Sequence, residues 1–144
     1  GKTSSIIEWA KNRSDVYGIV TPVLNGKRWF MNVSNGEKFK MEADKDEKDV
    51  LGVGNYVFSK NSFDQATEII KNSVSKNGWL IIDEIGPLEL RGEGFHDILK
   101  EIILSSNSHL KIVLVVRKSI LEKVMQHFGL SDYTNFFHEL NHEL

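Results

Sequence analysis

Residues 80–84 read LIIDE, and they carry most of what the sequence says about the fold. The stretch is apolar without alternation until it ends in two acids, which indicates a strand that helices cover on both faces. A second run of this kind, IVLVV at 112–116, lies downstream. Apolar residues recur at helical spacing in 63–75 and 95–104. Because helices alternate with buried strands, the sequence predicts an α/β fold with a mostly parallel sheet.

The N-terminal half contains two Asn-Gly pairs between short segments of strand character. The segments and pairs alternate along the chain: 16–21, Asn25-Gly26, 27–33, Asn35-Gly36 and 37–41. Asn-Gly favours the type I′ turn of a two-residue hairpin, because both central residues adopt positive φ. The pattern predicts a three-stranded antiparallel meander inserted into the α/β fold.

Other elements are predicted from the signals at their ends. A helix over 3–13 would place Lys11 and Arg13 at its C-terminal end, where the helix dipole favours cations. Ser119 and Glu122 have the spacing of a capping box, which begins a further helix. That helix is predicted over 119–128 and to end at Gly129. The remaining predictions are a solvated charged loop at 44–49, a short strand at 55–59 and a last strand at 134–140.

Length and composition exclude several classes of protein. The chain has 144 residues, of which 40% are hydrophobic and 26% charged, and this fits one domain over 1–144 with its own core. The net charge of −2 argues against a nucleic-acid-binding surface. No apolar run approaches the roughly 18 residues of a membrane span. The absence of cysteine excludes a disulfide framework and a cysteine-ligated zinc site, and it fits the reducing cytoplasm.

Two short segments together suggest a nucleotide site. Gly1-Lys2-Thr3 matches the last three positions of the P-loop pattern G-x-x-x-x-G-K-[ST] and begins a predicted helix. In that pattern the lysine contacts the β- and γ-phosphates, and the hydroxyl binds Mg²⁺. Asp83 and Glu84 lie at the end of a buried strand, where P-loop enzymes place the carboxylate that holds Mg²⁺. The alternative for the acidic pair is a solvated strand end.

Several stretches occur in the order of one known family: YGIVTP at 17–22, IIDEIGPLEL at 81–90, Gly94-Phe95 and LVVR at 114–117. With the meander between them, the chain resembles the small P-loop nucleoside-triphosphatase family known for a thermostable archaeal enzyme and its human cancer-related relative. The resemblance covers nearly the whole chain, and DEIGPLEL is its specific motif. It implies a three-layer P-loop fold and Mg²⁺-dependent hydrolysis of ATP, GTP and other nucleoside triphosphates.

The resemblance also implies roles for residues that match the family's motifs. Gly1, Lys2 and Thr3 would bind the nucleotide, with Lys2 neutralising the β- and γ-phosphates. Thr3 and Asp83 would ligate Mg²⁺, and Glu84 would orient or deprotonate the attacking water. Of the family's glycine-rich loop the chain has only the final glycine, so we expect a strand and the rest of the loop to precede Gly1 in the natural protein.

Three further features have a functional and a plainer interpretation. Arg117 follows the 112–116 run and could contact the γ-phosphate as an arginine finger, or be a surface cation. Glu89 could orient the site, or be a salt-bridge partner or a helix-end acid. Residues 138–142 satisfy the zinc pattern H-E-x-x-H. The sequence around them favours a strand, in which residues four positions apart lie about 13 Å from each other. The two histidines would then be too far apart to bind one zinc ion.

Two other functions are compatible with the sequence. A P-loop kinase for a small molecule would use the same phosphate contacts and bind its acceptor in the 17–42 region. A non-catalytic interaction module is the alternative if the natural protein lacks the phosphate-binding loop. An unpaired sheet edge beside the missing strand would then support a homodimer. The expected partner is a nucleoside triphosphate, whereas a membrane or a nucleic acid is not expected.

Overall fold

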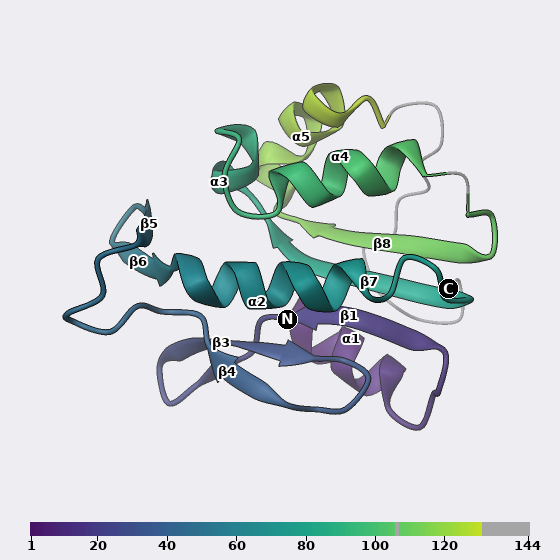
Figure 1. The fold of residues 1–144 in the computed structure, drawn as a ribbon, viewed down its shortest axis with the longest axis horizontal. Coiled ribbons are helices and arrows are strands. Elements are labelled where there is room, and N and C mark those ends of the chain that lie inside the picture. The colour runs from purple at the N-terminus through teal and green to yellow at the C-terminus, as the bar shows by residue number, and fades with distance from the viewer. Residues whose placement is uncertain (106, 131–144) are drawn as a thin grey trace.

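A computed structural model describes residues 1–105 and 107–130 of the chain (Figure 1). In chain order its elements are α1 (Lys2–Ala10), β1 (Val16–Val20), β2 (Val23–Leu24), β3 (Lys27–Asn32), β4 (Lys38–Lys40), β5 (Val50–Val53), β6 (Tyr56–Ser59), α2 (Lys60–Lys71), β7 (Gly78–Ile85), α3 (Pro87–Leu90), α4 (His96–Leu104), β8 (Leu110–Val116), the 3₁₀ turn η1 (Lys118–Ile120) and α5 (Leu121–Phe128).

The main sheet has the strand order β2-β3-β1-β7-β8, with β4 paired to β3. β1, β7 and β8 run parallel, with Ile19 opposite Ile82 and Ile82 opposite Leu114. β3 runs antiparallel to both β1 and β4. The predicted mostly parallel sheet with an antiparallel meander is therefore confirmed. Among the described residues, β8 has no strand on its outer side.

Helices cover both faces of the sheet, because β7 is apolar on both. Leu80 and Ile82 belong to the core under α2 and α4, which lie on the near face in Figure 1, whereas Ile81 packs in the cluster that α1 covers. None of the three side chains is exposed. Full burial of one such side chain stabilises the fold by about 1.5–3 kcal/mol. The three-layer arrangement that the family resemblance implies is thus built on the LIIDE strand.

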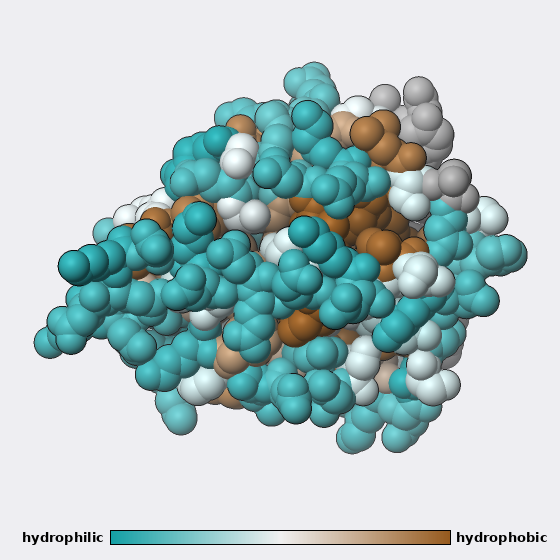
Figure 2. Space-filling view, in the orientation of Figure 1, coloured by the Kyte–Doolittle hydropathy of each residue, from teal (hydrophilic) through white to brown (hydrophobic). Residues whose placement is uncertain are grey.

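The helices of the near face turn one apolar side inwards. Ala66 and Ile70 of α2 are buried, as are Ile98 and Leu99 of α4. Figure 2 shows a mostly hydrophilic surface over these helices, with hydrophobic atoms visible between α2 and α4. The two amphipathic helices predicted from the spacing of apolar residues are confirmed.

The two Asn-Gly pairs form different turns. Asn25 and Gly26 have φ of 53° and 75° and join β2 to β3 in a two-residue hairpin, as predicted. In the second pair only Gly36 has positive φ, and its N–H donates to the Asn32 carbonyl over 2.8 Å. The type I′ prediction is wrong here, because the side chains of Asn32 and Asn35 each accept from the backbone two residues on and form Asx turns instead.

The first helix is shorter than its predicted range. α1 ends at Ala10, and Asn12 follows with φ of 69°. The predicted end at Arg13 is wrong, because Lys11 is the C-cap of α1 and Arg13 lies beyond it. Arg13 instead forms an ion pair with Asp15, with 3.2 Å between Nε and Oδ1.

The last described helix begins later than its capping signal predicts. Ser119 lies inside η1, and α5 starts at Leu121 with Ile120 as its N-cap and no capping side chain. The capping-box prediction is wrong, because the 3₁₀ turn includes the serine. Gly129 ends α5 with φ of 65°, as predicted. The strand predicted at 134–140 lies outside the described residues.

Three elements are not apparent from the sequence pattern, and one of them is β2, which pairs with β3. β5 pairs with β6 in a separate two-stranded sheet, and the short helix α3 follows β7. β6 corresponds to the short strand predicted at 55–59. The segment 44–49 contains no helix or strand, in agreement with the predicted charged loop.

Candidate functional site

The acidic pair lies at the carboxyl end of β7, where the strand is irregular. Its pairing with β8 shifts between Ile82 and Ile85. Glu84 has φ of 62°, a left-handed conformation that costs a residue with a side chain about 1–3 kcal/mol. Bulges and strained residues of this kind occur preferentially beside functional sites. The irregular part of β7 thus contains Asp83 and Glu84, the two acids that the sequence predicts as site residues.

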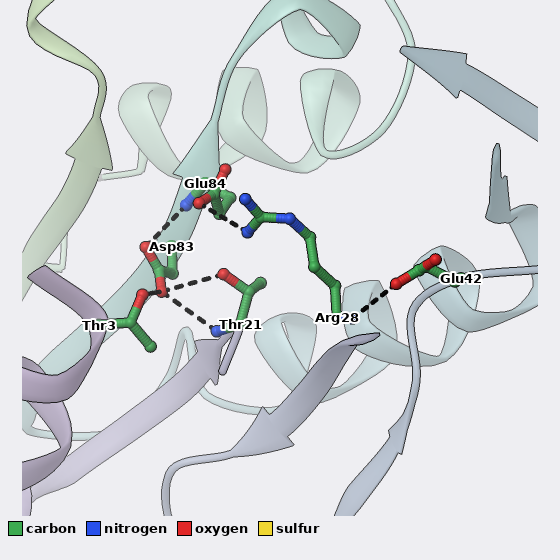
Figure 3. Close-up of polar contacts among 6 residues, drawn as sticks. All are labelled: Thr3, Thr21, Arg28, Glu42, Asp83 and Glu84. Atoms are coloured by element: carbon green, nitrogen blue, oxygen red, sulfur yellow. Dashed lines mark hydrogen bonds and ion pairs between the residues drawn. The ribbon is translucent and has the colours of Figure 1, made fainter. Parts of the chain in front are cut away.

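Asp83 is the hub of a hydrogen-bond network that joins α1, β1 and β7 (Figure 3). Its side chain is 1% exposed. Oδ2 accepts from Thr3 Oγ1 over 2.6 Å, and from the backbone N–H and hydroxyl of Thr21 over 3.1 and 3.2 Å. Oδ1 accepts from the N–H of Glu84 over 2.9 Å. Four donors therefore hold the carboxylate, and no cationic side chain of the described residues forms an ion pair with it.

The first turn of α1 brings the predicted phosphate-binding residues to the same place. Lys2 Nζ donates to the carbonyl of Val116, at the end of β8, over 3.2 Å. Gly1 is the N-cap of α1, and no acidic residue lies in its first turn. The backbone N–H groups at a helix N-terminus are a favourable site for anions. The structure thus brings Lys2, Thr3 and Asp83 together at one edge of the sheet.

Arg117 lies apart from this network. It is exposed and caps η1 directly after β8, so it lies beside the carbonyl to which Lys2 donates. Its side chain makes no hydrogen bond or ion pair with any residue in 1–105 or 107–130. Arg117 therefore lies at the same edge of the sheet as Lys2 and Asp83, but its side chain makes no hydrogen bond or ion pair with Asp83 or Glu84.

Two residues that take part in these contacts were not predicted as site residues from the sequence. Thr21 follows β1, the parallel neighbour of β7, and the carboxyl ends of parallel neighbours meet at one sheet edge. Arg28 of β3 forms an ion pair with Glu84, with 3.0 Å between Nη1 and Oε1. Strand alternation places Arg28 on the same face of β3 as the buried Phe30. A charged residue on a face that is otherwise buried is the sequence signal that could have identified Arg28 as a site residue.

Glu89 is a buried acid that organises the loop after β7. It is 2% exposed, and its two oxygens accept from the N–H groups of Gly86 and Phe95 over 2.7 and 2.9 Å. Burial raises the pKa of the Glu89 carboxyl to about 7, against the opposing effect of these backbone hydrogen bonds. Glu89 makes no hydrogen bond or ion pair with the predicted site residues, and Glu84 acts on it only through a small electrostatic effect that also raises its pKa. Of its two interpretations, the helix-end acid is the one confirmed.

The raised pKa of Glu89 makes the stability of the fold depend on pH. Between about pH 4.5 and 7 the unfolded chain releases this proton while the folded chain keeps it, so stability falls as pH rises. The loss across this window reaches about 3 kcal/mol, since each pKa unit corresponds to about 1.4 kcal/mol. Urea unfolding at a series of pH values should show that Glu89→Gln removes this component. The exposed Glu101→Gln should keep it, and an equal slope in wild type and Glu89→Gln would contradict the assignment.

Two negative findings concern other classes of site. Within 1–105 and 107–130, no three histidine or acidic side chains gather where they could hold a metal ion among themselves. The H-E-x-x-H stretch at 138–142 lies outside the described residues. None of the described helices is long and apolar enough to cross a bilayer.

Solved structures share this fold. The crystal structure of THEP1 from the hyperthermophile Aquifex aeolicus superimposes with a TM-score of 0.70 at 19% identity, over 98% of this chain and 82% of that one. The solution structure of a human cancer-related nucleoside triphosphatase gives a TM-score of 0.60 at 21% identity, over 88% of this chain and 78% of that one. Comparison with curated proteins found no match.

The layered, mostly parallel sheet covered by helices gives the chain a P-loop NTPase-like fold, which it shares with these two structures. The model of the NTPase family matches residues 2–138, and the chain belongs to that family. Family membership supports nucleoside-triphosphate hydrolysis in general.

Proposed function

We propose that this chain hydrolyses nucleoside triphosphates, ATP and GTP among them, with Mg²⁺ as cofactor. The observation that carries the proposal is the 2.6 Å hydrogen bond between Thr3 and Asp83 at the N-terminus of α1. A hydroxyl and a carboxylate are oxygen ligands of the kind that Mg²⁺ prefers. Their closeness, with Lys2 on the same helix turn, supports a site for a cation and a triphosphate together.

The donor set fits Mg²⁺, and Thr3 and Asp83 are the residues that would hold it. When bound, the cation neutralises charge that develops on the phosphate oxygens. The first-turn N–H groups of α1, next to Gly1, bind phosphate oxygens, and Lys2 adds a positive charge after leaving the Val116 carbonyl. Thr21 keeps the Asp83 carboxylate oriented through two hydrogen bonds.

Glu84 is the proposed base for the attacking water. One of its carboxylate oxygens bonds to Arg28, and within the described residues the other makes no hydrogen bond. A free carboxylate oxygen beside a triphosphate is placed to accept a proton from water. Arg117 is a proposed γ-phosphate contact, supported by its position directly after β8.

Mg²⁺ dependence tests this function. The natural protein, with any residues its gene encodes before Gly1, should release phosphate from ATP and GTP, and EDTA should abolish the release. Thr3→Val should raise the Mg²⁺ concentration for half-maximal rate about tenfold, the scale for loss of a metal-supporting group. Ser4→Ala, on the next and exposed hydroxyl, should leave it unchanged. Phosphate release that resists EDTA would overturn the Mg²⁺ dependence, and ATP loss that occurs only with an added acceptor would overturn hydrolysis.

Two further expectations belong to the same proposal. A cytoplasmic location stays a prediction from composition. A homodimer through the sheet edge beside the missing strand also stays a prediction. Among the described residues, β8 forms one edge of the main sheet, and β2 and β4 lie at the other.

A further inference from the structure

We propose that Arg28 is a positioning residue for Glu84, and that it fixes the carboxylate which activates water. The proposal rests on the proposed function. Nη1 of Arg28 and Oε1 of Glu84 are 3.0 Å apart, and the two side chains are only 17% and 30% exposed (Figure 3). A partly buried arginine–carboxylate pair is stronger and better defined than an exposed ion pair.

Arg28 is itself held before it meets Glu84. Its backbone N–H donates to Glu42 Oε2 over 2.7 Å, and its carbonyl accepts from Met41 over 3.2 Å. The guanidinium carbon lies 5.5 Å from the ring centroid of Tyr56, within the range of a cation–π contact. The two backbone hydrogen bonds fix the main chain of Arg28, and the contact with Tyr56 restricts where its guanidinium can lie. Less side-chain freedom therefore remains to be lost when the ion pair forms.

Glu84 needs such a partner, because its own strand does not determine where its carboxylate points. It lies in the irregular part of β7 with φ of 62°, where the alternation of a regular strand no longer sets side-chain direction. Its backbone N–H is bonded to Asp83, which fixes the main chain but not the carboxylate. Arg28 contacts Oε1 and leaves Oε2 available, so one oxygen is anchored while the other can accept a proton.

The ion pair could instead serve only to tie β3 to β7. A structural tie would affect stability and every step of turnover alike, whereas a positioning residue affects the chemical step. If Arg28 acts through Glu84, its effect must also disappear when Glu84 can no longer act as a base.

The experiment is a double-mutant cycle in single-turnover hydrolysis. Arg28→Met should lower the rate of the chemical step about tenfold, less than the hundredfold loss that a 1 Å displacement can cause. Nucleotide affinity should not change, and Arg28→Lys should restore part of the rate. In a Glu84→Gln background, Arg28→Met should have almost no further effect. Lys38→Met removes an exposed cation of the neighbouring strand β4, whose side chain makes no ion pair within the described residues, and should leave the rate unchanged.

Four outcomes would overturn the proposal. One is an equal loss from Arg28→Met in both backgrounds, which would mean that Arg28 acts on the nucleotide or through the fold. Another is a loss of nucleotide affinity in place of rate. The third combines two results: the effects of the Arg28 and Glu84 substitutions on the free energy of unfolding are coupled, and the wild type releases no phosphate. The ion pair would then have only a structural role. Active wild type with a fully active Arg28→Met would reject the role of Arg28 and leave the proposed function intact.

Discussion

Gly18→Ala should destabilise the protein by about 4 kcal/mol or more, because backbone strain and overpacking add at this position. Gly18 lies in β1 with φ of 110°, a conformation that side-chain-bearing residues rarely adopt. A Cβ atom there would collide with the backbone carbonyl of Ile81 in β7. The loss is a large part of the roughly 5–15 kcal/mol that stabilises a typical domain. The variant should therefore unfold at a much lower urea concentration than the wild type.

Urea unfolding of Gly18→Ala beside Gly26→Ala measures this effect. Gly26 also has positive φ, but a Cβ atom there would meet no atom within 4 Å. Gly26→Ala should therefore cost only the conformational penalty of about 1–2 kcal/mol. Equal losses in the two variants would show that β1 and β7 can move apart at Gly18, in contradiction to the close packing described above.

The fold was predictable wherever the information is local. LIIDE is apolar on both faces, and this alone specifies a strand between two layers. Asn25-Gly26 specifies its hairpin for the same reason, since the turn depends on two adjacent residues. Asn35-Gly36 shows the limit of such signals, because hydrogen bonds from neighbouring asparagine side chains give a longer loop instead.

The candidate site was predictable only in part. Lys2, Thr3 and Asp83 belong to motifs, and the structure brings them together at one sheet edge. Thr21 lies in the YGIVTP stretch, for which no site role was predicted, and Arg28 belongs to no motif. The role of each comes from contacts between segments far apart in the chain. The contact of Arg28 with Glu84 depends on the order of β3, β1 and β7, which no local pattern determines.

Glu84→Gln should lower the rate of nucleoside-triphosphate hydrolysis by about 10²–10⁴-fold, the usual contribution of a general base. Glutamine has nearly the same shape as glutamate, and its amide oxygen can still accept from Arg28. The change removes the ability to accept a proton from water. The backbone N–H of residue 84 remains, so its bond to Asp83 should persist. Nucleotide binding through Lys2 and Thr3 should therefore be unchanged.

Phosphate release in a single turnover, measured beside nucleotide binding, separates these effects. Wild type and Glu84→Gln should bind ATP equally and differ in the rate of phosphate release. Glu93→Gln is the matched control, because Glu93 is an exposed acid whose ion pair is with Arg91, away from the network around Asp83. Its rate should equal that of the wild type. Unchanged turnover in Glu84→Gln would remove Glu84 from the role of base, and equal losses in both variants would point to a general effect of charge.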